Sequence, residues 1–246
     1  MTFHIITLFP HAFDSYLGES ILKRAILYRK IRVKFYNPRD FADNKWTKSA
    51  KGGSSGQQSW LRKRIDRKPF GGGPGMVIQA EPVIRAIERA YFNVLKNTRI
   101  KSSKKLKAKS YKLKAPLIWL TPSGKQFTNE MGVTYAKLSH LIIICGRYEG
   151  IDARVKRAFK VEEVSVGPFV LTGGELPAML MIDVIARQVE GVLGDFNSRE
   201  EARIASPDVY TRPEVLTYKG KNYRVPKVLL SGHRAKIDEW KLKRGK

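Results

Sequence analysis

The sequence predicts an α/β protein built around a mainly parallel sheet. Short apolar runs follow one another along the chain, stretches with helical periodicity separate several of them, and glycine-rich loops end several of the runs. Strands that alternate with helices in this way are typical of parallel sheets. A chain of 246 residues can bury such a core in one large domain and still carry a small second unit.

The first half of the chain is predicted to contain two strands and two helices. Pro10 ends the first strand, and Pro82 fits the first turn of the second helix. Between the second strand and the second helix lies a long polar segment that ends in GGGPG, at about residues 39–75. In order, the predicted elements are a strand at 3–9, a helix at 20–30, a strand at 31–38 and a helix at 81–95.

The second half is predicted to contain three strands, each followed by a loop rich in small residues, and then a long apolar helix. These elements are strands at 116–122, 140–146 and 164–174 and a helix at 176–193. The chain then becomes polar up to Pro207, as a linker would, and a small unit with a final helix around 236–243 follows.

The net charge favours a polyanionic partner. The chain has 47 Lys and Arg against 22 Asp and Glu, which gives +25. Basic residues gather at 60–68, 96–114 and 236–246. One such segment alone is equally well explained as solvated surface, but three together favour nucleic acid. None of them lies beside an amphipathic helix with a wide apolar face, which argues against a membrane partner.

Cysteine and histidine usage excludes several kinds of site. The single cysteine, Cys145, rules out an intramolecular disulfide framework and a Cys-rich zinc site, and suits a reducing cytoplasm. The four histidines are scattered, so no local cluster predicts a metal site. No apolar run approaches the roughly 20 residues that span a bilayer, and the first residues lack the basic region of a signal peptide. We therefore expect a cytoplasmic protein.

The segments most indicative of chemistry are three loops that directly follow predicted strands, at 121–124, 145–152 and 165–177. Ligands of open α/β sheets bind at the carboxyl ends of the strands. Each loop alone could be a tight turn, but together they could surround a small organic ligand. The glycine run at 71–75 fits neither a Walker A loop nor GxGxxG, so NTP hydrolysis and dinucleotide binding are poorly supported.

These motifs carry a resemblance. GGGPGM, LTPSG, CGRYEGID, VLTGGELPAM, and YTRPEVL followed by LLSGH, in this order over nearly the whole chain, resemble the bacterial tRNA (guanine(37)-N1)-methyltransferase family. That family belongs to the trefoil-knotted SPOUT class. The resemblance implies a deep trefoil knot in the sheet domain and a small C-terminal helical unit. It divides the chain into a knotted domain at 1–193, a linker at 194–206 and a shortened tRNA-contacting unit at 207–246.

The resemblance also implies S-adenosylmethionine as methyl donor, held by the three loops. Glycines would allow close backbone approach, apolar side chains would receive the adenine, and Glu149 could offset the sulfonium charge. Core packing is the alternative role for each aliphatic member. The implied donor-binding residues are Leu120, Pro122, Gly124, Gly146, Tyr148, Glu149, Ser165, Val166, Gly167, Pro168, Phe169, Val170, Leu171, Gly173, Gly174 and Pro177.

Two catalytic residues follow from the resemblance. Guanine N1 carries a proton, so a carboxylate should remove it while a cation stabilises the charge that develops on O6. Arg187 matches the family's arginine, although a structural pair with Asp183 is the alternative. The family's carboxylate motif departs here to NSREEAR. Without a gap Ala202 falls at the position of the base, whereas a one-residue deletion places Glu201 there, which we favour because a carboxylate is required; Glu200 is the alternative.

The implied reaction is transfer of the methyl group to N1 of guanosine 37 in tRNA, next to the anticodon, by a homodimer whose active site lies at the subunit interface. The family also suggests help from Mg²⁺. Two alternatives stay open: a non-catalytic RNA-binding protein of the same fold, and a SPOUT methyltransferase that acts on rRNA. The chain departs from the family at Gly167-Pro168-Phe169, in its basic insertions at 47–64 and 96–114, and in its shorter C-terminus.

Overall fold

The computed structural model describes residues 1–42, 64–97, 115–194 and 208–244. They divide into two compact units, Met1–Val192 and Leu193–Lys246. None of the described helices is long and apolar enough to cross a membrane.

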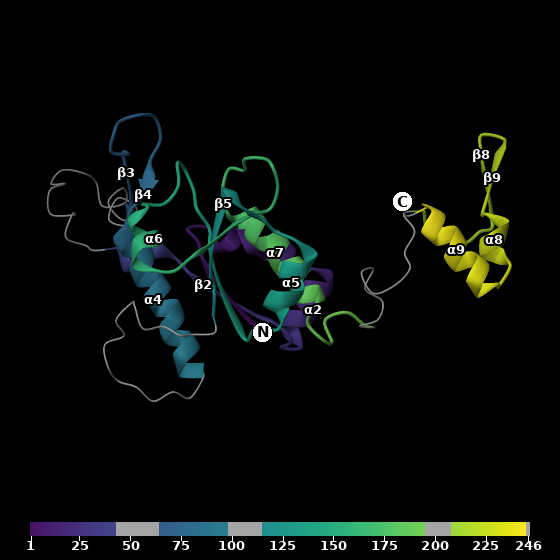
Figure 1. The fold of residues 1–246 in the computed structure, drawn as a ribbon, viewed down its shortest axis with the longest axis horizontal. Helices are drawn as coiled ribbons and strands as arrows, with labels where there is room; N and C mark the ends of the chain where they lie inside the picture. Colours follow the sequence, from purple (N-terminus) through teal and green to yellow (C-terminus); the bar gives the residue numbers. More distant parts are fainter. Residues whose placement is uncertain (43–63, 98–114, 195–207, 245–246) are drawn as a thin grey trace, which may run out of the picture. The chain divides into compact units, whose positions relative to one another are not determined.

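The first unit is organised by a five-stranded sheet in the order β2-β1-β6-β5-β7, and every neighbouring pair is parallel (Figure 1). The mainly parallel α/β class predicted from the sequence is therefore confirmed. The strands are β1 (Thr2–Ile6), β2 (Arg32–Tyr36), β5 (Leu117–Gln126), β6 (His140–Ile144) and β7 (Glu162–Ser165).

Helices cover both faces of this sheet, and each face has its own hydrophobic cluster. One face packs against the short η1 (Pro10–Phe13) and α1 (Asp14–Leu17) and against α2 (Ser20–Leu27), α5 (Asn129–Ala136) and α7 (Glu175–Arg187). The other packs against η2 (Pro38–Phe41), α4 (Ala80–Asn97) and α6 (Arg154–Ala158). Figure 1 shows α4 and α6 on one side of the strands and α7 and α5 on the other.

The apolar run of β6 shows why the sequence lacks alternation there. Leu141 and Ile143 belong to the cluster beneath α7, whereas Ile142 and Ile144 belong to the cluster beneath α4. All four are buried. A strand covered on both faces needs apolar side chains at consecutive positions, which is the pattern of a parallel sheet between two helical layers.

Several predicted elements end earlier than expected. The strand predicted at 3–9 ends at Ile6, and the helix predicted at 20–30 ends at Leu27. The strand predicted at 164–174 stops at Ser165, because the Ser165 hydroxyl turns the chain by donating to the Gly167 carbonyl (2.9 Å) and accepting from the Gly167 amide (3.3 Å). The helix predicted at 176–193 stops at Arg187. Beyond it, Gly191 takes a left-handed φ of +77°, which a continuing helix would not contain.

The strand predicted at 116–122 is longer than expected and runs through residue 126 as β5. Both Leu120 and Lys125 lie opposite Val164 of β7, so the four residues between them form an irregularity inside the strand. The TPSG loop is therefore an excursion from β5 rather than a segment that follows it.

Some elements had no counterpart in the sequence analysis. These are α5, α6, the short η1, η2 and α1, and a two-stranded antiparallel pair of β3 (Asp66–Arg67) with β4 (Val77–Ile78). The glycine run connects β3 to β4, and four of its glycines have positive φ. This segment is joined to the loop after β6, because the Glu149 amide donates to the Met76 carbonyl at 3.1 Å.

The second unit contains the helices α8 (Lys227–Leu230) and α9 (Arg234–Arg244) and, in addition, an antiparallel hairpin of β8 (Val215–Tyr218) and β9 (Lys221–Arg224). Lys219 and Gly220 both have positive φ at the turn, as a tight two-residue hairpin requires. Residues 195–206 of the predicted linker lie outside the described residues.

Candidate functional site

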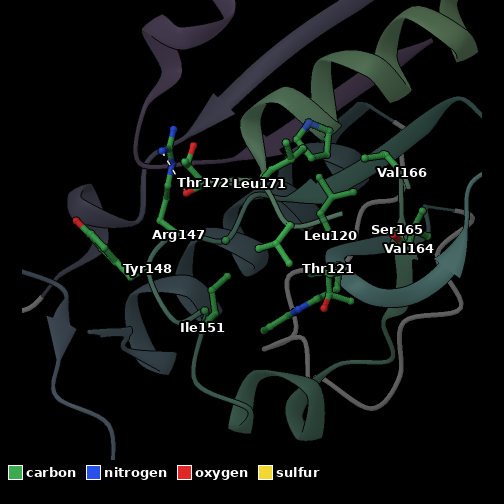
Figure 2. A pocket seen from close by; sticks show the side chains of 18 of the residues that line it. Leu120, Thr121, Arg147, Tyr148, Ile151, Val164, Ser165, Val166, Leu171 and Thr172 are labelled. Carbon is green, nitrogen blue, oxygen red and sulfur yellow. Dashed lines mark hydrogen bonds between the residues drawn. The ribbon is translucent and has the colours of Figure 1, made fainter. Parts of the chain in front are cut away.

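The candidate site is a pocket of about 450 Å³ at the excursion of β5 and the carboxyl ends of β6 and β7, beside the start of α7. This volume is within the range of small-molecule sites. Three loops form its walls, as the sequence predicted, and Figure 2 shows their side chains around it. Of the predicted donor residues, those that line it are Leu120, Pro122, Gly146, Tyr148, Glu149, Ser165, Val166, Phe169, Val170, Leu171, Gly173, Gly174 and Pro177.

Three predicted residues are absent from the pocket lining: Gly124, Gly167 and Pro168. The two glycines have packing roles instead. A Cβ at Gly124 would lie 2.5 Å from the Val164 amide nitrogen, so glycine lets the excursion return against β7. A Cβ at Gly167 would lie 2.2 Å from the Phe169 ring, which occupies that space.

The loop after β6 enters the pocket with an unusual backbone. Tyr148 has a φ of +60° and Gly150 a φ of +118°. Left-handed backbone at a residue other than glycine is uncommon and needs support from its surroundings. Two backbone hydrogen bonds supply that support. The Glu149 amide donates to the Met76 carbonyl, and the Ile78 amide donates to the Gly150 carbonyl at 3.0 Å. The GGGPGM segment therefore braces the loop after β6.

The third loop presents an apolar rim. Phe169, Val170 and Leu171 are 52%, 83% and 37% exposed, although large apolar side chains are usually covered. In Figure 2 Leu171 and Leu120 lie near each other in the centre of the view, and Tyr148 points away from both. A ligand with an apolar part could cover this rim.

The pocket's charged side chains leave one carboxylate for a ligand. Lys156 pairs with Glu163 at 2.6 Å and lies over the Trp119 ring, and Arg147 pairs with Glu175 at 2.8 Å. Among the residues that the structure describes, none forms a hydrogen bond or ion pair with the Glu149 carboxylate. The pocket therefore offers an uncompensated negative charge, which suits a cationic group such as a sulfonium.

Two glycines of the pocket lining differ in the space that they leave for a ligand. A Cβ added at Gly146 would meet no atom within 4 Å, so the pocket is open at this point. At Gly174, by contrast, a Cβ would lie 2.6 Å from the Cys145 Cα, because α7 begins directly against the end of β6. Open volume, an apolar rim and a free carboxylate together fit S-adenosylmethionine.

Cys145 lies beneath the pocket but is not a nucleophile. It is buried, and burial, followed by the Glu175 carboxylate, raises the pKa of its thiol well above the usual range. A neutral, inaccessible thiol has no reactive role.

The structure does not show the predicted catalytic pair together, because only Arg187 is among the described residues. Glu201 and Glu200 lie outside them. Arg187 is the last residue of α7, is partly buried, and does not line the pocket. Asp183, its alternative partner, accepts a hydrogen bond from the Tyr16 hydroxyl at 3.0 Å. Burial, followed by this bond to Asp183, raises the pKa of Tyr16.

Sequence reasoning missed several lining residues. Some of them lie inside the quoted motifs but were not singled out there, and the others lie in β5, in β7 and at or beside α6. The missed residues are Trp119, Thr121, Arg147, Gly150, Ile151, Ala153, Lys156, Val164 and Thr172. Arg147 had the clearest signal, since it lies inside the CGRYEGID motif, but its partner Glu175 is 28 residues away. Within residues 1–42, 64–97, 115–194 and 208–244, no three His, Cys, Asp or Glu side chains gather where they could hold a metal ion.

Comparison with known proteins places the whole chain in one sequence group. The family model described as tRNA (guanine-1)-methyltransferase TrmD matches residues 1–246. A tRNA (guanine-N(1)-)-methyltransferase of Clostridioides difficile is 39% identical over 245 residues, which is 98% of this chain and 90% of the relative. Relatives with the same name from Ruminiclostridium cellulolyticum and Neisseria meningitidis are 38% and 39% identical over 246 residues, 98% of this chain and 90% and 84% of theirs.

Proposed function

The chain belongs to the tRNA (guanine-1)-methyltransferase family, and from this premise we propose that it transfers a methyl group from S-adenosylmethionine to N1 of guanosine 37 in tRNA. The observation that carries the proposal is the pocket at the excursion of β5 and the carboxyl ends of β6 and β7, which combines an apolar rim, close backbone approach and an unpaired carboxylate. When bound, S-adenosylmethionine supplies a methyl group activated by a sulfonium.

In this proposal the three loops bind the donor. The apolar side chains of Leu120, Val166 and Leu171 and the backbone at Gly146 would hold its adenosine part, and Glu149 would offset its positive charge. The methyl acceptor would then approach from the open side of the pocket. Positioning both reactants supplies part of the rate enhancement.

The proton and the developing charge need separate groups. The Glu201 carboxylate would accept the N1 proton, which converts N1 into a nucleophile, and the Arg187 guanidinium would stabilise negative charge on O6. Glu200 is the alternative base. Removing either the base or the cation should lower the rate of methyl transfer more than the affinity for donor or tRNA.

The proposed homodimer is supported by the surface of α7. Leu176 and Leu180 are 58% and 41% exposed, and Arg187 shares their side of the helix by its spacing. An exposed apolar stripe is typical of a face that a partner covers. A second copy on this face would lie beside Arg187, so we place the active site at the subunit interface. The trefoil knot and the division at residues 193 and 206 belong to the same proposal.

The second unit would contact tRNA. Its hairpin carries Tyr218 and Tyr223, which are 59% and 49% exposed, with Lys219 and Lys221 5.5 and 5.4 Å from the respective ring centres. Exposed aromatic rings next to cations suit stacking on unpaired bases and contact with phosphates. The tRNA substrate and the single buried cysteine support a cytoplasmic location. Assistance by Mg²⁺ remains part of the proposal, supported by the family resemblance alone.

The test is methyl transfer from labelled donor to a tRNA with guanosine 37, to the same tRNA with adenosine 37, and to rRNA. We expect label in the first substrate only, recovered as N1-methylguanosine. Glu201→Gln should reduce the rate by about 100-fold or more, while Glu200→Gln should leave it nearly unchanged; the reverse result would move the base to Glu200. Tight tRNA binding without label in any substrate would favour a non-catalytic RNA-binding protein. Label in rRNA alone would favour a methyltransferase that acts on rRNA.

A further inference from the structure

We propose that Arg147 and Glu175 are positioning residues that hold the second and third pocket loops together and so set the affinity for the methyl donor. The inference builds on the proposed function, since it concerns the same pocket. Neither residue belongs to the donor-binding or catalytic set derived above.

Glu175 is the fixed end of this pair. It is the first residue of α7 and only 2% exposed, yet both carboxylate oxygens have partners. Oε1 accepts from the Thr7 hydroxyl at 2.7 Å, and Oε2 accepts from Arg147 Nε at 2.8 Å. The amino end of a helix also favours a negative charge. Glu175 is therefore held from three sides: the end of β1, the loop after β6 and its own helix.

Arg147 is the end that reaches the pocket. It lines the cavity and donates from Nη1 to the carbonyl of Thr172 in the third loop at 3.4 Å. Its guanidinium lies 4.7 Å from the centre of the Phe9 ring. In Figure 2 Arg147 and Thr172 lie side by side at one edge of the pocket, joined by a dashed line. One side chain thus connects the loop after β6 to the loop after β7.

Backbone contacts also join the two loops around this pair. Arg147 forms an antiparallel bridge with Gly173, and the Gly174 amide donates to the Gly146 carbonyl at 2.9 Å. A Cβ at Gly173 would lie 2.3 Å from Arg147 Nε, so the glycine makes room for the guanidinium. The Arg147 side chain therefore fills the space between the two loops where their backbones meet.

A stabilising role alone would not explain why the pair is charged. A buried ion pair adds little stability relative to well-packed apolar side chains, but it enforces one geometry. The geometry enforced here is that of the loop carrying the exposed Phe169, Val170 and Leu171. If Glu175 loses its charge, Arg147 loses its anchor, and this loop should no longer be held against the loop after β6.

The test compares Glu175→Gln, Arg147→Ala and the double variant by donor-binding calorimetry and steady-state kinetics. Glu175→Gln should raise the donor Kd and the donor KM by about 10-fold to 100-fold, the range for losing a hydrogen bond to a charged group. The KM for tRNA and the kcat at saturating donor should change less than about threefold. A general loss of folded protein would instead lower the apparent kcat and leave both KM values alone.

The double variant distinguishes positioning from direct donor contact. Arg147→Ala leaves the Glu175 carboxylate buried without its cation, so the single variant should bind donor more weakly than the double variant, in which that charge is also removed. If Arg147 itself contacted the donor, the double variant would bind as weakly as Arg147→Ala, and Glu175→Gln would have little effect. That result, or additive effects, would overturn the proposal.

Two further variants protect the test against misfolding. Glu81→Gln is a matched control, because Glu81 also lies in the first turn of a helix and accepts from an arginine, Arg85, but lines no part of the pocket. It should bind donor as the wild type does. Thr7→Val removes the hydroxyl that donates to Glu175 and accepts from the Phe9 amide at 3.0 Å. It should raise the donor KM by about threefold to tenfold even if Arg147→Ala does not fold; no change in Thr7→Val would count against the proposal.

Failure of the proposed function would look different. A wild type that shows no heat with S-adenosylmethionine and methylates no tRNA contradicts the function itself. A wild type that binds donor and methylates tRNA, with Glu175→Gln behaving identically, contradicts the positioning role only.

Discussion

Two clusters of buried and half-buried polar side chains at the same sheet differ in what surrounds them. The first consists of Arg147, Glu175 and Thr7 and lies at the carboxyl ends of β6 and β1. The second is a chain of hydrogen bonds from Asn93 through Tyr36 and His4 to His140. The first borders the pocket and its exposed rim, whereas none of the four residues of the second lines the pocket.

The second cluster consists of uncharged side chains, whereas the first contains a charged pair. Asn93 Nδ2 donates to the Tyr36 oxygen at 3.0 Å, and His4 joins Tyr36 at 2.8 Å and His140 at 3.1 Å. Burial, followed by the nearby His140 and then Lys34, lowers the pKa of His4 to about 3. Burial likewise lowers the pKa of His140. A neutral network inside the sheet can specify how β1, β2 and β6 meet, whereas the charged pair holds loops that must receive a ligand.

The largest expected effect separates the pocket from the rest of the sheet. Gly146→Val should reduce methyl transfer by roughly 100-fold or more, because its side chain would project into open pocket space that the donor needs. The same open space means that the substitution clashes with nothing, so the Tm should change little. Steady-state kinetics and thermal unfolding check both parts; unchanged activity would show that the donor binds elsewhere.

The reciprocal variant is Tyr36→Phe. It removes the hydroxyl that His4 and Asn93 share, so a buried imidazole and a half-buried amide lose a partner, and the free energy of unfolding should fall by about 1–3 kcal/mol. Donor affinity should stay within about twofold of wild type, since the donor pocket does not include this residue. Denaturant unfolding and donor calorimetry measure the two quantities. A large loss of donor affinity without loss of stability would break the distinction between the clusters.

The most gradual effect is the pH dependence of stability, which is small for each step in pH. His4 has a folded-state pKa of about 3, below its ordinary value of 6.5, so the unfolded chain binds the proton more readily. Its contribution to stability is complete above pH 6.5 and is lost as the pH falls from there toward 3. The slope should reach about 1.4 kcal/mol per pH unit for this group.

Denaturant unfolding between pH 7 and 4 measures that slope, and His4→Asn should make it shallower because asparagine does not titrate. An equal slope in wild type and variant would show that His4 is not the group responsible.

Particular elements show what the sequence could predict. The apolar run of β6, the helical periodicity of α4 and the order of three loops rich in small residues were local patterns, and they led to the parallel sheet and to the pocket, although the first of these loops lies inside β5 rather than after it. The end of β7 was not predictable in this way, because it depends on one hydroxyl, that of Ser165, turning toward the backbone of Gly167.

The same distinction between local patterns and contacts made only in the fold holds for the candidate site. Motifs identified most of the pocket lining, but they could not distinguish a glycine that opens space, Gly146, from one that allows packing, Gly124, since that depends on what lies opposite. Arg147 and Glu175 were missed as a pair because they are distant in sequence and meet only in the fold. The hairpin at Lys219-Gly220 carried a turn signal that the sequence analysis did not use.

Hydrogen exchange with and without S-adenosylmethionine locates the donor most directly. We predict that saturating donor slows amide exchange in the loops at 121–124, 146–152 and 166–174, while the amides of β1 around His4 and those of the β8–β9 hairpin exchange at unchanged rates. Binding that left these three loops unprotected and slowed exchange elsewhere would contradict the assignment of this pocket to the methyl donor.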